Sequence, residues 1–171
     1  HLLRQRGHEG GSRDGMDASL IEYDPTTEGF EFVGANNPGF MIGEVSFEDE
    51  SLVKVHEING TKLYELKPMK QPLGINKSGN SDSFFAINGT AKKGTKVYLL
   101  SDGYADQFGS DLGQENNGKG KKFRIKNLRE KLVEIHTFPM DQQHRELHTT
   151  MSIWKGALEQ VDDITVLGVT L

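Results

Sequence analysis

Residues 96–109 read KVYLLSDGYADQFG. The apolar run at 97–100 predicts a strand over 95–100 that is hydrophobic enough to lie centrally in a sheet. This run stops abruptly at the tripeptide Ser-Asp-Gly of 101–103, so a carboxylate and a glycine follow the strand directly. A hydrophobic strand that ends in this way is suited to holding a ligand at the edge of the sheet.

A second acidic segment stands near the end of the sequence. Asp162 and Asp163 precede a β-branched run at 164–171, which predicts another strand. Because the end of one antiparallel strand lies beside the start of the next, Asp102 and the acidic pair can meet at one sheet edge. The two segments therefore form a candidate constellation.

Carboxylates gathered in this way repel each other unless a cation neutralises them. Mg²⁺ and Mn²⁺ prefer such oxygen ligands, and two metals about 3.5–4 Å apart can activate a water and bind a phosphoryl group. We expect Gly103 to let the backbone turn sharply beside the ion. The alternative is that Asp102 and Gly103 form an ordinary turn and that residues 162–163 are a solvated loop.

The rest of the sequence predicts an α+β fold in which helices pack on sheet. Asn59 and Gly60 separate two strand-like runs, which is the favoured turn of a two-residue hairpin. Helical periodicity at 141–159 places Leu147, Met151, Trp154 and Leu158 on one core-facing side. The expected strands are 18–23, 30–33, 40–42, 52–58, 61–66, 83–87, 95–100 and 164–171, and the expected helices are 125–135 and 141–159.

Composition narrows the classes of function. The 171 residues suggest one domain, and the net charge of −5 argues against nucleic acid as a partner. The chain has no cysteine, so thiolate chemistry and disulfides are excluded and a reducing compartment fits. No run approaches the roughly 20 apolar residues that span a bilayer, so we expect no membrane contact by this region.

Several segments together resemble one family. The stretch SDGYADQFG at 101–109 resembles the (T/S)DG(V/Y) motif of the metal-dependent type 2C protein phosphatases, and QVDDITV at 160–166 resembles the DDIT motif of their sporulation protein E branch. FVGANNP at 32–38 and KPMKQPLGI at 67–75 stand where that branch has two further motifs. The resemblance extends from about residue 14 to 171.

The resemblance implies an αββα sandwich with a binuclear Mn²⁺ or Mg²⁺ centre that hydrolyses phosphoserine or phosphothreonine through a metal-bound water, without a protein nucleophile. It implies Asp102 and Asp162 as metal ligands, with Asp163 as an alternative ligand or an outer group. Gly103 and Asp106 take supporting positions. Asn36 and Asn37 replace the Gly-His that the branch often carries.

One motif of the family is not found. Its first metal motif should precede this region, and HEGG at 8–11 is only superficially similar to it. We therefore expect residues 1–171 to be the C-terminal portion of the phosphatase domain, with its N-terminal part missing. We expect residues 1–15 to be irregular and 109–121 to be a flexible insertion. An incomplete sandwich would leave an apolar sheet face free to self-associate, giving a possible homodimer.

The resemblance implies the output domain of a bacterial sensor or two-component signalling protein, cytoplasmic or on the cytoplasmic side of a membrane-anchored sensor. Expected partners are an upstream sensor domain in the same polypeptide and a phosphoserine protein substrate, for example an anti-sigma-factor antagonist. Two alternatives remain: a catalytically inactive phosphatase fold that binds a partner, and a carboxylate-lined metal-binding β domain of unrelated fold.

Two other patterns have simpler interpretations. His144 and His148 have a spacing that can bind zinc, but Arg145 stands where a metalloprotease needs Glu, so we expect a solvated helix face. The basic cluster 119–122 can contact phosphate, or it is a plain flexible loop.

Overall fold

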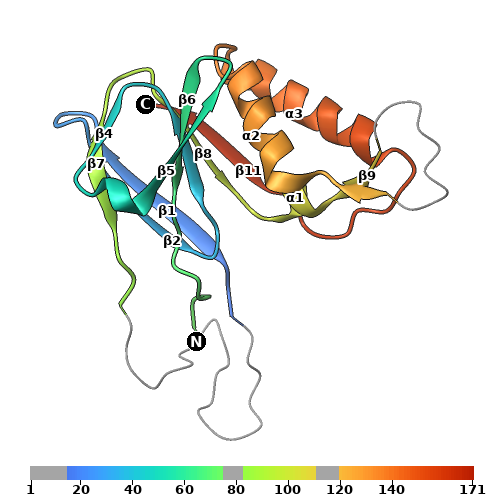
Figure 1. Ribbon diagram of the computed structural model, residues 1–171, viewed down its shortest axis with the longest axis horizontal. Helices are drawn as coiled ribbons and strands as arrows, with labels where there is room; N and C mark the ends of the chain where they lie inside the picture. The colour runs from blue at the N-terminus through green and yellow to red at the C-terminus, as the bar shows by residue number, and fades with distance from the viewer. Residues whose placement is uncertain (1–14, 75–82, 111–119) are drawn as a thin grey trace, which may run out of the picture.

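The computed structural model describes residues 15–74, 83–110 and 120–171. Two antiparallel sheets pack face to face, and the two long helices lie together against one of them (Figure 1). The described part of the chain therefore has a helix layer followed by two sheet layers. This arrangement agrees with the predicted α+β class.

The four-stranded sheet has the order β1-β2-β7-β4. A hairpin of β1 and β2 begins it, with Ala18 opposite Ala35 and Asp24 opposite Gly29. The Asp24 carboxylate accepts a hydrogen bond from the Thr26 backbone N–H at 2.8 Å, which fixes the connecting turn. The four strands are β1 (Ala18–Asp24), β2 (Gly29–Ala35), β7 (Ile87–Ala91) and β4 (Val45–Phe47).

The five-stranded sheet has the order β11-β8-β3-β6-β5. Its β5–β6 hairpin turns at Asn59 (φ 51°) and Gly60 (φ 77°), and positive φ at both central residues is what the predicted Asn-Gly turn requires. Strand β8 lies between β3 and β11 and is central, as predicted. The strands are β11 (Val166–Thr170), β8 (Lys96–Leu100), β3 (Gly39–Ile42), β6 (Thr61–Leu66) and β5 (Val53–Ile58).

Two hydrophobic cores follow from the alternation of side chains along the central strands. Phe40, Tyr98 and Leu100 face the helices, where they pack with Leu128, Leu132 and other helix residues. Met41 and Val97 point the other way and pack with Phe32 and Ile87 of the four-stranded sheet. Because both faces of β8 are buried, its sequence reads as an almost continuous apolar run.

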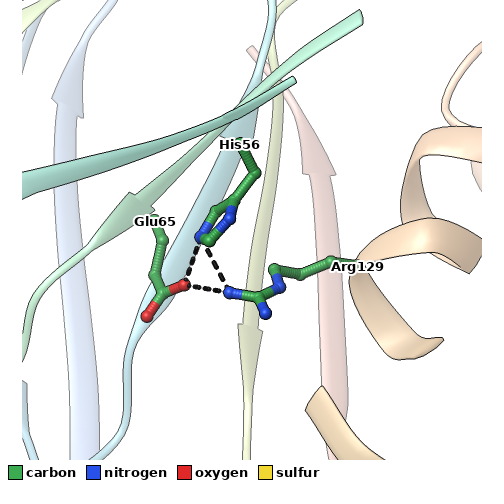
Figure 2. Close-up of polar contacts among 3 residues, drawn as sticks. All are labelled: His56, Glu65 and Arg129. Carbon is green, nitrogen blue, oxygen red and sulfur yellow. Dashed lines mark hydrogen bonds and ion pairs between the residues drawn. The ribbon is translucent and has the colours of Figure 1, made fainter. Parts of the chain in front are cut away.

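The helices are α1 (Gly103–Asp106), α2 (Arg124–Ile135) and α3 (Met140–Lys155), and a single 3₁₀ turn, η1, covers Glu50–Leu52. A polar cluster attaches α2 to the β5–β6 hairpin (Figure 2). The Arg129 Nη1 and the His56 Nε2 each lie 2.7 Å from Glu65 Oε2, and these three side chains are only 14–21% exposed. None of the helices in the described ranges is long and apolar enough to cross a membrane.

Two predicted elements were misplaced. The strand expected at 83–87 begins only at Ile87, and residues 83–86 are irregular. Strand β7 contains Gly89 because a Cβ there would collide with the Ser46 carbonyl oxygen and lie 2.9 Å from the Phe30 ring. The helix expected to reach 159 ends at Lys155, because Gly156 follows with a left-handed φ of 55°.

The expected insertion at 109–121 is only partly described. Its ends pair as two short strands, β9 (Phe108–Gly109) and β10 (Lys121–Lys122), which the sequence did not predict. Gly109 is buried, and a Cβ at this position would collide with the Trp154 backbone. Residues 111–119 and 1–14 lie outside the described ranges, so the predicted flexibility of the insertion and irregularity of the N-terminus stay predictions.

Candidate functional site

The two acidic segments lie side by side where β8 ends and β11 begins. The strands are antiparallel with Leu100 opposite Val166, and their pairing continues beyond the strands, since the Ser101 N–H donates to the Thr165 carbonyl at 3.0 Å. The Ser101 hydroxyl donates to the Asp163 carbonyl at 2.9 Å and accepts from the Thr165 N–H at 3.0 Å. This one side chain therefore fixes the backbone of the second segment against the first.

Gly103 is required for a different reason from the expected sharp turn. It begins α1 and does not have a left-handed φ. A Cβ at this position would collide with the Asp163 carbonyl oxygen and lie 2.9 Å from the Asp163 carbonyl carbon. Close approach of the two segments, rather than backbone freedom, selects glycine here.

The three candidate carboxylates are exposed. Asp102 is the N-cap residue of α1, but its side chain makes no capping hydrogen bond. The Asp162 Oδ1 accepts a hydrogen bond from the Asp163 N–H at 2.7 Å. None of the three makes an ion pair with any residue of the described ranges.

Gln107 joins both segments to the helix layer. It is completely buried, and its Nε2 donates to the Phe108 carbonyl at 3.0 Å and to the Glu159 carbonyl at 2.9 Å. Its Oε1 accepts from the Val161 N–H at 3.3 Å. The Gln107 carbonyl accepts from the Trp154 indole N–H at 3.1 Å. One amide therefore holds residues 159–161, which lead directly into Asp162.

An aromatic cluster packs between α1 and the two long helices. Tyr104, Phe123 and Trp154 make successive edge-to-face contacts, each with ring centroids 5.3 Å apart. The Tyr104 hydroxyl donates to the Leu147 carbonyl at 2.9 Å, and burial raises the pKa of this hydroxyl above its usual range. The short helix that follows Asp102 is thus anchored on α2 and α3.

Further motif segments reach the same end of the sandwich. Gly39 at the start of β3 pairs with Leu99 on one side and with Leu66 on the other, so the segment that ends at Pro38 and the segment that begins at Lys67 lie near the end of β8. Asn36 (φ 60°) donates from Nδ2 to Asp17 Oδ1 at 2.7 Å. Ile75, like residues 8–11, lies outside the described residues.

The carboxylates of the two acidic segments are chemically suited to a hard divalent cation. They do not by themselves form a full set of metal ligands. Asp102 and Asp162–Asp163 offer carboxylate oxygens from adjacent segments. Asp106 is paired with Lys122 Nζ at 2.7 Å. Within the described ranges no group of three or more His, Cys, Asp or Glu side chains is placed to hold a metal ion. The metal-binding roles of the aspartates and the supporting role of Asp106 therefore stay predictions.

The other two patterns lie outside this constellation. His144 and His148 are exposed on α3 with ring centroids 6.5 Å apart, in agreement with a solvated helix face. Lys121 and Lys122 are exposed on β10, and Lys119 lies outside the described residues. A phosphate contact by this basic cluster stays a prediction.

Similarity to solved structures identifies the architecture. The SiaA-PP2C domain of Pseudomonas aeruginosa superimposes with a TM-score of 0.69 at 22% sequence identity, over 91% of this chain and 51% of that chain. The chain has the fold of a PP2C-type phosphatase domain. It spans about half the length of the SiaA-PP2C chain (51%). The magnesium complex of RsbX matches with a TM-score of 0.45 at 14% identity, over 90% of this chain and 55% of that chain.

No protein-family model and no curated protein sequence matches the chain. The PP2C fold confirms the predicted fold class. The second of the two alternatives from the sequence, a carboxylate-lined metal-binding β domain of unrelated fold, is thereby excluded. Assignment to the sporulation protein E branch, and to its C-terminal portion, stays a prediction.

Sequence reasoning missed the two residues that hold the site together. Ser101 was noted only as part of the motif, and Gln107 was not considered. A polar residue that closely follows the small and aromatic residues Gly103 to Ala105, which are buried, was the signal that could have indicated Gln107.

Proposed function

We propose that the chain carries part of the active site of a metal-dependent protein phosphatase. In this proposal Asp102, together with Asp162 and Asp163, binds Mn²⁺ or Mg²⁺ and residues outside the described ranges complete a binuclear centre. The metals supply a reactive water and neutralise the phosphoryl oxygens when bound. The observation that carries the proposal is the contact of the two acidic segments, with exposed carboxylates, at one end of a PP2C fold.

The wider assignment is also a proposal. The substrate is a phosphoserine or phosphothreonine protein, for example an anti-sigma-factor antagonist, and the domain is the cytoplasmic output module of a bacterial sensor or two-component protein. The PP2C fold and the order of the SDG and DDIT motifs support it. The acidic net charge of −5 supports a protein substrate over nucleic acid.

A second candidate function is a phosphatase fold that binds a signalling partner without chemistry. One observation favours it: the described residues contain no group of three or more metal-ligating side chains. In this case the exposed aspartates would be surface residues, and the tightly held 159–163 segment would form part of a binding surface.

The test is hydrolysis of p-nitrophenyl phosphate and of a phosphoserine peptide by the full natural polypeptide, with and without Mn²⁺ or Mg²⁺. We expect metal-dependent hydrolysis that falls at least about 100-fold in Asp102→Asn. The matched control is Asp141→Asn, an exposed aspartate on α3 paired with Arg145, which should keep full activity. A folded protein that hydrolyses neither substrate with either metal would overturn the enzyme proposal in favour of the binding module.

A further inference from the structure

One tetrapeptide occurs twice in the chain, in two different settings of the fold. Ile-Asn-Gly-Thr stands at 58–61 and again at 87–90. The first copy forms the turn of the β5–β6 hairpin, where Asn59 and Gly60 are exposed. The second copy lies within β7, an interior strand of the four-stranded sheet, where Asn88 and Gly89 are partly buried. Because the local sequence is identical, a difference in reactivity between the two copies comes from the fold.

The Asn-Gly pair within this tetrapeptide carries a reaction that needs only water. The backbone nitrogen of the glycine attacks the side-chain carbonyl carbon, Cγ, of the asparagine and closes a five-membered succinimide ring. The bond from this nitrogen to Cγ forms, the bond from Cγ to Nδ2 breaks, and ammonia leaves with the proton of the glycine N–H. Water then adds to either ring carbonyl and returns the proton to the nitrogen, which yields aspartate or isoaspartate. Glycine favours the attack because it has no Cβ to obstruct it.

Ring closure requires rotation of the main chain at the asparagine, so its rate depends on how easily the segment opens. The second copy is held on both sides. Gly89 lies opposite Phe30 of β2 and opposite Phe47 of β4. The Asn88 carbonyl accepts a hydrogen bond from the Glu48 N–H at 3.0 Å. Opening the chain at this position therefore separates three strands of the four-stranded sheet.

The first copy is held much less. Asn59 and Gly60 lie beyond the last pair of the β5–β6 ladder, which is Ile58 opposite Thr61. The Gly60 N–H makes no hydrogen bond to the residues that the structure describes. A Cβ at Gly60 would meet no described atom within 4 Å beyond its chain neighbours, so the space around the attacking nitrogen is open. Opening a turn of this kind costs little free energy compared with opening a central strand.

We propose that Asn59 is a deamidation site of the native chain, and that the sheet protects Asn88 although its neighbours in sequence are the same. The turn itself selects the labile pair, since positive φ at both central residues, 51° and 77°, favours Asn-Gly. The reaction is independent of the proposed phosphatase function, because Asn59 takes no part in the candidate site.

The isoaspartate product changes the hairpin. Its main chain passes through the former side chain, so the turn gains one backbone atom and no longer fits a two-residue connection between Ile58 and Thr61. Ile58 packs against the core on the helix side of the five-stranded sheet. Isoaspartate at position 59 should therefore loosen this end of the hairpin. The aspartate product keeps the original main chain, and Asp-Gly is accepted by the same turn.

The first experiment is incubation of the folded chain at mildly alkaline pH, followed by peptide mapping with mass spectrometry. Trypsin releases residues 55–62 and 78–92 as separate peptides, so the conversion of Asn59 and that of Asn88 are followed independently. In the folded chain we expect Asn59 to convert at least about tenfold faster than Asn88. In urea the two rates should become similar, because the tetrapeptides are identical. Circular dichroism confirms that the chain without urea is folded.

The second experiment compares urea unfolding of the aged chain with that of two fresh variants. The fraction that contains isoaspartate at position 59 should unfold at a lower urea concentration than Asn59→Asp, which adds the charge without lengthening the turn. Asn59→Gly keeps a turn that Gly-Gly accepts and removes the reactive amide. Ageing of this variant should release no ammonia from the hairpin and should leave the unfolding midpoint unchanged.

Three outcomes would overturn the proposal. One is equal conversion of Asn59 and Asn88 in the folded chain. Another is an Asn59 that stays intact in the folded chain while both asparagines convert in urea, which would show that the turn protects its amide. The third is an isoaspartate form that unfolds at the same urea concentration as Asn59→Asp, which would contradict the effect on the turn.

Discussion

Two groups of charged side chains lie at the five-stranded sheet, and they differ in burial and in ion pairing. At the β5–β6 side, His56, Glu65 and Arg129 are mostly buried and in mutual contact (Figure 2). At the β8–β11 side, Asp102 and the Asp162–Asp163 pair are exposed and make no ion pair with the described residues. In the first group, ion pairs between the charged side chains connect α2 to the β5–β6 hairpin. In the second group, other residues fix the backbone, and the carboxylates make no ion pair with the described residues.

This difference separates a structural cluster from a candidate site. In the cluster around Glu65, the carboxylate oxygen Oε2 is shared by Arg129 and His56, so this charge attaches α2 to the β5–β6 hairpin. Around Asp102 the rigid parts are Ser101, Gly103 and Gln107, which fix the two segments without using a carboxylate. A site that binds a cation needs this combination of a fixed backbone and unpaired oxygens.

The largest expected effect comes from removing the amide that holds the acidic segments. Gln107→Ala leaves the Val161 N–H and the Glu159 and Phe108 carbonyls without this partner in a buried region. At about 1–3 kcal/mol for each group, the free energy of unfolding should fall by about 4 kcal/mol, as measured by urea denaturation. Gln142→Ala on α3, half-buried, is the control and should stay within about 0.5 kcal/mol of wild type.

A smaller effect is expected from adding one methyl group where the two acidic segments are in close contact. Gly103→Ala drives a Cβ into the Asp163 carbonyl, and overpacking of this kind costs about 1–3 kcal/mol. Gly29→Ala is the matched control, because its Cβ would meet only the Thr27 hydroxyl at 3.1 Å. Thermal unfolding of both variants compares them. Equal losses in the two proteins would contradict the close approach at Gly103.

The smallest effect is expected in the structural cluster. Glu65→Ala leaves Arg129 and His56 without their shared carboxylate, but both side chains retain some exposure to water. The free energy of unfolding should fall by about 1–2 kcal/mol, with no change in divalent-cation binding. Glu130→Ala, which removes the exposed pair with Lys126 at 3.8 Å, should cost less than about 0.5 kcal/mol. Weaker cation binding in Glu65→Ala would contradict the assignment of this cluster to a structural role only.

Much of the fold could be predicted because it depends on sequence patterns within short segments. The Asn59–Gly60 turn, the apolar run of β8 and the stripe of Leu147 and Met151 each follow from chemistry within a few residues. The placement of the two acidic segments could also be predicted, because in an antiparallel pair the end of one strand lies beside the start of its neighbour.

What could not be predicted depends on contacts between distant residues. Strand β7 was misplaced because Gly89 is selected by Ser46 and Phe30, which lie more than 40 positions away in the sequence. Gln107 was missed because its partners are at 159–161. Gly103 was recognised, but for backbone freedom rather than for the carbonyl that it accommodates.

The central claim is that the exposed carboxylates at the β8–β11 end bind a divalent cation. The most direct measurement is a Mn²⁺ titration of the chain, in which electron paramagnetic resonance counts free metal. We expect weak saturable binding, weakened at least about tenfold by Asp102→Asn and by Asp162→Asn but unchanged in Asp141→Asn. Equal Mn²⁺ affinity in wild type, Asp102→Asn and Asp162→Asn would contradict the claim.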